Sequence, residues 1–453
     1  MLPQSKCEEE PNQANQLVSE HVPLQMGWVS DEDSSPQWNG RMLQCHNAED
    51  AFEILPQGVK RPELYKRMRP VKRVMRCLGF LPMALYDDSW RIASKILWPL
   101  ISCLFFLINL YMAAFNAYNI DQMRQFQGLM HVDTMSMVLV SIKPWHNLIC
   151  LGTFISRVRS HRLLFSAFQE AEIAFRKNFR AQVCWRKYNL IFITTMSTIG
   201  LLAFLARVVQ YVLLWVYVPP FSNFLNDASL MLVPLLSLWQ LAPLFYFWYL
   251  NKLLQHWFGT LHAGLTKDTN LTQRSVRFYY QHYLLLTRSV ASITRFFSPF
   301  IFLSLVGSIA VLCLTIYFFA HAEEGIMVPP NATLIDTINH YYFPMWAGLQ
   351  ILAAVLYILL LVLSGLTTNE VSRAVMIPVL NLAPRDSFSR FQVLTFVHKI
   401  QSQFGWGITV WRAVAIERGM LFTMFGLVMT YAMVLLQMKK AALLSMMQTG
   451  GVD

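Results

Sequence analysis

The chain has 453 residues, of which 55% are hydrophobic and only 14% are charged, and its mean hydropathy is +0.39. Soluble domains carry roughly 25% charged residues, so the composition excludes an ordinary soluble enzyme and indicates a polytopic membrane protein. The net charge of +11 does not indicate nucleic-acid binding, because the basic residues lie between apolar runs, as positive-inside sorting predicts. The seven cysteines show no metal-ligand spacing, and we expect no disulfides in external loops.

The first part of the chain is polar. Residues 1–70 are rich in Glu, Asp, Gln, Asn, Pro and Ser and are predicted to form a mostly disordered cytosolic tail without a cleaved signal peptide. Basic residues crowd its end and the residues that follow: Lys60, Arg61, Lys66, Arg67, Arg69, Lys72, Arg73 and Arg76. Such a cluster either stops translocation, the reading we favour, or binds lipid headgroups.

Seven apolar runs follow, each with about the 20 residues that a bilayer core requires. Their approximate bounds are Ile96–Tyr118, Thr134–Ile155, Asn189–Val218, Ala228–Leu250, Phe296–Ala320, Tyr342–Leu366 and Ile416–Met438. We therefore predict an all-α polytopic membrane protein with seven transmembrane helices. Its predicted parts are a six-helix ligand-sensing bundle with inner extensions over residues 71–366, an anchor segment at 367–415, the last helix at 416–438 and a short tail at 439–453.

The orientation follows from Lys and Arg counts. The connections on one side hold 30 of these residues and those on the other side hold 3, which predicts a cytosolic N-terminus and an extracellular C-terminus. The long inner connections show helical spacing of apolar residues, so they are predicted to extend the membrane helices into a cytosolic anchor domain. Of two glycosylation signals, Asn331 is expected to be used and Asn270 to be silent, since one span separates them.

No constellation typical of catalysis is present, so the sequence predicts no enzyme, no cofactor and no metal site. Lys143 and Arg207 lie deep within spans, where each costs on the order of 3 kcal/mol, so they should face the bundle interior or a watery cavity. The candidate ligand-binding residues are polar and aromatic side chains in the outer halves of the helices: Lys143, His146, Arg207, Gln210, Tyr211, Trp239, Gln240, Tyr342, Trp346 and Gln350. Two alternatives remain open. In the first, backbone carbonyls or lipid headgroups pair with the basic side chains. In the second, the aromatic residues form an interfacial belt.

The last apolar run places Thr430, Val434 and Gln437 at i, i+4 and i+7, on one face of a helix. A span that contacts only lipid has no reason to align a hydroxyl, a branched aliphatic side chain and an amide. The stripe therefore favours a helix that borders a water-filled pore. The alternative is a packing helix in which Gln437 reaches the headgroups.

The chain resembles the insect-type gustatory receptor family, which also contains the odorant receptors. Thr430-Tyr431, followed after five residues by Gln437, is similar to the tail signature of that family, with Met438 where the family usually has Phe. Gln403–Val410 and Arg76–Pro82 resemble the segments that precede the last and the first span. The match covers about residues 72–438.

The resemblance implies a chemosensory receptor of gustatory type in the plasma membrane of sensory neurons, acting as a tetrameric ligand-gated non-selective cation channel. It implies one central pore, with Val434 as the apolar constriction and Gln437 as the polar ring, and a small-molecule ligand bound among helices two to six. The tetramer would be homomeric or built with related subunits, in contact with membrane lipid and cations. A G-protein-coupled receptor and a channel-less transporter or scaffold are the alternatives.

Overall fold

Every residue described below belongs to one compact unit, Val59–Asp453. The computed structural model describes residues 63–81, 92–127, 132–181, 183–215, 224–268, 273–322, 334–382, 387–411 and 413–449. Almost all of the predicted N-terminal tail and both glycosylation signals, Asn270 and Asn331, lie outside these residues.

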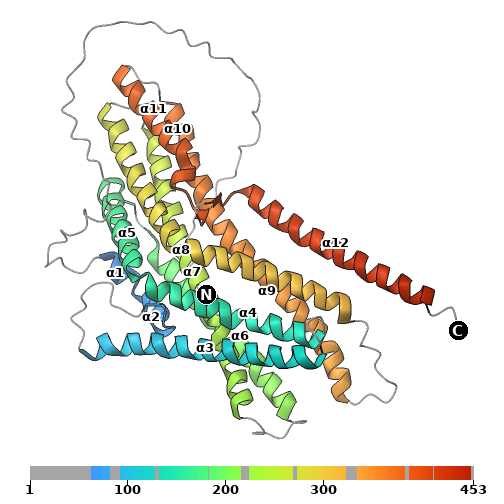
Figure 1. Cartoon of the computed structure of the whole chain (residues 1–453). Coiled ribbons are helices and arrows are strands. Elements are labelled where there is room, and N and C mark those ends of the chain that lie inside the picture. Colours follow the sequence, from blue (N-terminus) through green and yellow to red (C-terminus); the bar gives the residue numbers. More distant parts are fainter. Residues whose placement is uncertain are drawn as a thin grey trace, which may run out of the picture. The chain divides into compact units, whose positions relative to one another are not determined.

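The described chain is built almost entirely from helices (Figure 1). These are α1 (Glu63–Arg67), α2 (Arg69–Cys77), α3 (Ile92–Gln127), α4 (Val132–Ser156), α5 (Val158–Phe179), α6 (Trp185–Trp215), α7 (Phe224–Lys267), α8 (Gln273–Ala322), α9 (Leu334–Ala374), α10 (Met376–Leu380), α11 (Ser387–Gln401), the 3-10 turn η3 (Ser402–Gly405) and α12 (Arg418–Thr449). The predicted helical membrane fold is thus confirmed. One feature departs from it, a small antiparallel hairpin of β1 (Thr409–Val410) and β2 (Val414–Ala415) directly before α12.

Six helices of the described part are long and apolar enough to cross a membrane, in the segments Ile96–Phe126, Met137–Ser156, Trp185–Ala206, Ser275–Tyr317, Ala347–Leu380 and Arg418–Leu435. Each of the seven predicted runs lies largely within a helix. The fourth, Ala228–Leu250, lies within α7 but is not among the six. The first part of this run, Ala228–Pro234, lies outside the residues whose side chains are described, so the six segments do not test the fourth span.

The helices continue past the apolar runs at the ends predicted to be inside. α7 ends at Lys267 and α8 begins at Gln273, whereas the adjacent runs end at Leu250 and begin at Phe296. α5 is a separate helix, because the chain leaves helical geometry at Arg157. These inner segments pack through buried aromatic rings, among them Phe168 of α5 against Trp257 of α7 at 5.6 Å between centroids.

The helices differ sharply in how much of them is covered. α8 and α9 pack against each other and against α7, and 44% of the apolar stretch of each is buried. Only 11% of the corresponding stretch is buried in α6 and in α12. Figure 1 shows α12, in red, with most of its length clear of the other helices. Within one chain, the last helix therefore has few protein neighbours.

The inner core contains a buried histidine that ties α5 to α7. His161 Nε2 hydrogen-bonds Tyr246 Oη at 2.8 Å, and its ring centroid lies 4.9 Å from that of Phe296. Burial lowers the pKa of His161 to about 3, from its ordinary value of about 6.5. The folded state therefore binds fewer protons than the unfolded state between these two values. The resulting stability is present above pH 6.5 and is lost as the pH falls toward 3.

We expect acid to destabilise the protein through this side chain, by about 2 kcal/mol between pH 6.5 and 5.0. The measurement is the melting temperature of the purified protein in detergent at pH 7.5 and at 5.0. His161→Gln still hydrogen-bonds Tyr246 and does not titrate, so its melting temperature should fall less between the two pH values. His398→Gln, at an exposed histidine of α11, is the control. An equal fall for wild type and His161→Gln contradicts this assignment.

Candidate functional site

A chain of buried polar groups connects four helices. His146 Nε2 of α4 lies 3.0 Å from Ser304 Oγ of α8, and Ser304 Oγ lies 3.1 Å from Tyr357 Oη of α9. Tyr357 donates in turn to the backbone carbonyl of Gln240 in α7 at 3.4 Å. Because Tyr357 uses its proton in that bond, it accepts the hydrogen bond from Ser304. Ser304 in turn accepts from the Nε2–H of His146, which leaves Nδ1 of His146 as an acceptor. We call these four residues the polar cluster.

The polar cluster is surrounded by apolar and weakly polar groups. The rings of Phe300 and Tyr357 each lie 6.3 Å from the His146 ring, and Cys150 Sγ is 3.7 Å from His146 Nε2. At Gly307 of α8, a Cβ atom would come within 3.8 Å of the His146 ring. A few directed polar groups in an apolar wall are typical of a site for a small ligand.

Two nearby polar atoms are buried without a hydrogen-bond partner among the described residues: Asn147 Oδ1 and Trp239 Nε1. Asn147 Nδ2 does have one, since it donates to the carbonyl of Leu236 at 2.9 Å and links α4 to α7. Buried polar atoms are rarely left unpaired, so each is suited to accept or donate a bond to a ligand or an ordered water.

The predicted ligand-binding residues meet this region only in part. His146 belongs to the polar cluster, whereas Gln240 joins it through its carbonyl and not its side chain. Trp239 packs against Phe105 of α3, with ring centroids 4.9 Å apart. Lys143 and Gln350 are half-buried. The side chains of the remaining candidates lie outside the described residues: Arg207, Gln210, Tyr211, Tyr342 and Trp346.

Sequence reasoning missed Ser304 and Tyr357. Each is a single polar residue in an apolar run, and a hydroxyl in such a run is often satisfied by its own helix. Both lie in the inner halves of their predicted spans, outside the outer halves in which the sequence placed the ligand, so position gave no signal for them. They are distinguished from other hydroxyls by hydrogen-bond partners on another helix, which only the tertiary structure shows.

The predicted pore stripe lies on the uncovered face of α12. Val434 is 47% exposed, and Thr430 and Gln437 are also exposed. The Thr430 hydroxyl donates to the carbonyl of Gly426 at 2.8 Å, so it needs no further partner as a donor. The residues that pack α12 against the core are on another face: Met420, Leu421, Met424 and Val428. The stripe thus points away from the core of its own chain.

A compact joint fastens the start of α12 to α9. The buried Asn369 side chain donates to the carbonyls of Ile408 and Ile416, both at 3.1 Å, and accepts from the Ile408 N–H at 2.9 Å. Ile408 precedes β1 and Ile416 follows β2, so one amide group holds both sides of the hairpin. Gln403 Nε2 donates to the Asn369 carbonyl at 2.8 Å. These residues, with Gly407, form what we call the α9–hairpin joint.

Close packing explains two glycines here, one against a backbone carbonyl and one against side chains. A Cβ atom at Gly407 would lie 2.8 Å from the Gln403 carbonyl oxygen, and one at Gly365 would lie 3.0 Å from Ile416 Cδ1. The element Gln403–Val410, which resembles a segment of the gustatory receptors, is thus the part of the chain that builds the joint.

Two ion pairs flank the joint. Arg373 bonds Glu417 and Arg418 bonds Glu370, each at 2.6 Å, with partly exposed or exposed side chains. Surface pairs of this kind stabilise by about 0–1 kcal/mol, so the buried amide contributes more to the joint than they do.

The described chain has the fold of an insect olfactory receptor. It matches the structure of the insect olfactory receptor OR5 from Machilis hrabei with a TM-score of 0.60 over 83% of this chain and 98% of that chain, at 16% sequence identity. A curated relative in sequence is the "Probable G-protein coupled receptor egl-47" of Caenorhabditis elegans, 29% identical over 408 residues, or 86% of this chain and 77% of the relative. No protein-family model matches. The predicted resemblance is confirmed at the level of the fold, and the gustatory type stays a prediction.

Proposed function

We propose that this chain is a chemosensory receptor of gustatory type and a subunit of a ligand-gated, non-selective cation channel in the plasma membrane. One observation carries the proposal: the stripe Thr430, Val434 and Gln437 lies on a face of α12 that its own chain leaves uncovered. Lipid can cover the apolar residues of that face, but an amide in hydrocarbon needs water or a polar partner. A ring of α12 helices around an aqueous axis supplies that water.

The proposed assembly is a tetramer, either of identical chains or with related subunits. Four copies of α12 would form one pore, with the Val434 side chains as an apolar constriction that closes by dewetting. The Gln437 side chains would form a polar ring one turn further along the pore. The fold shared with an insect olfactory receptor and the tail motif support this arrangement.

The proposed ligand is a small molecule that binds at the polar cluster. Tyr357 of the cluster and Asn369 of the joint lie on the same helix, α9, with a rise of about 18 Å between them. A ligand that favours one position of α9 would therefore bias the start of α12 through the joint. The coupling is a difference in ligand affinity between the closed and open states.

Tyr357→Phe is expected to raise the agonist concentration for half-maximal response about tenfold. The change removes the hydroxyl that bonds Ser304 and the Gln240 carbonyl, and the loss of one such bond corresponds to about 1–1.5 kcal/mol. The measurement is a dose–response curve by calcium imaging, with an agonist found by screening. Tyr111→Phe, at an exposed tyrosine of α3, should leave the curve unchanged. Indistinguishable curves for Tyr357→Phe and wild type would contradict the role of the cluster.

A G-protein-coupled receptor is the second candidate, and the name of the Caenorhabditis elegans relative favours it. Such a receptor has an extracellular N-terminus, whereas the charge distribution of this chain predicts a cytosolic one.

Antibody access to an N-terminal tag decides between these two candidates. We expect labelling only after permeabilisation, together with agonist-evoked currents that persist when G-protein signalling is blocked. Labelling of intact cells, with currents that need G proteins, would overturn the channel proposal. If the protein reaches the membrane but no tested ligand evokes a current, the third alternative, a transporter or scaffold without a channel, would be favoured.

In the same cells, Asn331→Gln should remove an N-linked glycan and Asn270→Gln should not.

A further inference from the structure

Three arginines surround a cavity between α1, the end of α5 and the segment that leads into α6. The cavity has a volume of about 430 Å³ and is lined by Arg67, Arg176, Arg180, Ala181 and Val183. We propose that it binds a multiply phosphorylated anion of the inositol phosphate type, either as the headgroup of a membrane lipid or as the free phosphate ester. This inference does not depend on the proposed channel function.

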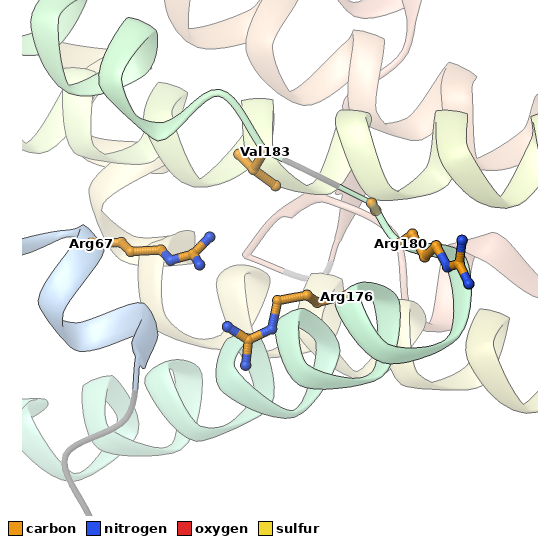
Figure 2. Close-up of a pocket in the computed structure, with 5 residues that line it drawn as sticks. Arg67, Arg176, Arg180 and Val183 are labelled. Carbon is orange, nitrogen blue, oxygen red and sulfur yellow. The ribbon is translucent and has the colours of Figure 1, made fainter.

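The side chains are arranged to receive an anion. Figure 2 shows the guanidinium groups of Arg67 and Arg176 near each other, reaching from α1 and α5, whereas Arg180 lies at the other end of the cavity with its guanidinium group directed away from them. Guanidinium groups repel one another, and an anion between them replaces that repulsion with attraction. Their planar donors fit phosphate oxygens in pairs, and the carboxylate of Glu172, which pairs with Arg67, balances a single one of the three positive charges.

Arg67 is held in place by buried neighbours. The carboxylate of Glu172, whose side chain is only 3% exposed, lies 3.5 Å from Arg67, and the Trp185 ring centroid lies 5.9 Å from Arg67 Cζ. The backbone carbonyl of Arg67 accepts a hydrogen bond from Asn189 Nδ2 at 2.8 Å. Burial raises the pKa of Glu172, and the positive charge of Arg67 opposes this rise. Glu172 offsets part of the positive charge and positions the guanidinium group at the cavity.

The end of α5 adds an independent observation. Arg180 directly follows the last residue of that helix and has a φ of 50°, a left-handed conformation for which glycine is usual. The sharp turn places Arg180 at the cavity and directs the chain through Val183 into α6. A cationic side chain thus stands where backbone geometry alone would favour glycine.

The location and volume suit a phosphorylated headgroup. α6 begins at Trp185 and opens a candidate membrane span, so the cavity lies only a few residues from the membrane surface. The charge distribution predicts that this is the cytosolic side, where anionic lipids are concentrated. The volume falls within the roughly 300–1,000 Å³ of small-molecule sites and has room for more than one phosphate.

The test measures binding by the full-length protein in detergent, with two fluorescent probes: short-chain phosphatidylinositol 4,5-bisphosphate and soluble inositol 1,4,5-trisphosphate. The test variant is Arg176→Gln/Arg180→Gln. The matched control is Arg159→Gln/Arg162→Gln, which changes two exposed arginines of the same helix and the net charge by the same amount. We expect the test variant to lose affinity at least tenfold and the control to stay within about twofold of wild type.

The two probes distinguish the sources of the anion. Binding of the lipid alone assigns the site to a membrane headgroup, and comparable binding of both probes shows that the phosphate ester suffices. Equal losses in the two double variants would show diffuse charge attraction and overturn the proposal, as would a wild type that binds neither probe. Arg180→Gln alone should bind the probes about threefold more weakly than wild type. Because this side chain is exposed, the single variant still tests the site if the double variant does not fold. Binding is measured without current, so this test can fail while the channel proposal holds.

Discussion

Replacing Asn369 with alanine is expected to reduce the maximal agonist-evoked current at least tenfold while the protein still reaches the cell surface. The side chain makes three hydrogen bonds to the backbone of Ile408 and Ile416. Its removal takes the partner from the Ile408 N–H and from the Ile416 carbonyl, at about 1–3 kcal/mol each, whereas the Ile408 carbonyl keeps its bond from the Ile416 N–H at 3.1 Å. Since these groups hold the start of α12 to α9, motion of α9 would no longer reach the pore helix.

The control for this experiment is Asn109→Ala. Asn109 is also a buried asparagine, but its side chain bonds the Phe105 carbonyl of its own helix, α3, at 2.9 Å and bonds no second element among the described residues. The measurement is the whole-cell current, normalised to the protein labelled at the cell surface. The role assigned to the joint is wrong if both variants lose current equally, or if Asn369→Ala responds like wild type. Glu417→Arg, which breaks an exposed ion pair, should have a smaller effect.

Val434→Lys is expected to abolish cation conduction. Four lysines at the constriction of a tetramer would each repel a cation by about 0.7 kcal/mol at ~6 Å, even in bulk water. Together they add about 3 kcal/mol to the barrier, which corresponds to a conductance lower by about two orders of magnitude. Gln437→Glu places four carboxylates in the next ring and should raise the permeability for divalent over monovalent cations. The agonist-evoked current amplitude measures the first effect, and reversal potentials in mixed solutions measure the second.

Met433→Lys is the matched control for the pore variants. Met433 precedes Val434 on α12 and is exposed at 62%, but it lies off the stripe of Thr430, Val434 and Gln437. A conducting Val434→Lys variant, or an unchanged selectivity in Gln437→Glu, would falsify the pore assignment. If Met433→Lys alone abolished conduction, a neighbouring face of α12 would line the pore.

The sequence by itself determined the class of fold and the position of the last helix. Apolar runs of about 20 residues mark membrane spans wherever they occur, because the bilayer imposes that length locally. The alignment of Thr430, Val434 and Gln437 likewise needed only helical geometry. The helix ends could not be read in this way. Hydropathy reports where the bilayer stops, whereas α7 continues to Lys267 because its aromatic residues pack against α5 and α8.

Only the tertiary structure decided which polar residues act together. His146 and Ser304 are 158 residues apart, and Gln403 bonds the Asn369 backbone across 34 residues. A lone serine or tyrosine in an apolar run has the same local pattern whether its hydroxyl bonds its own helix or a neighbouring one. The basic residues near Arg67 likewise left both a topology signal and headgroup binding open, and only the packing of α5 placed Arg176 and Arg180 at one cavity with Arg67. The energy of a buried hydrogen bond depends on a partner that helix packing supplies, and local periodicity does not encode that partner.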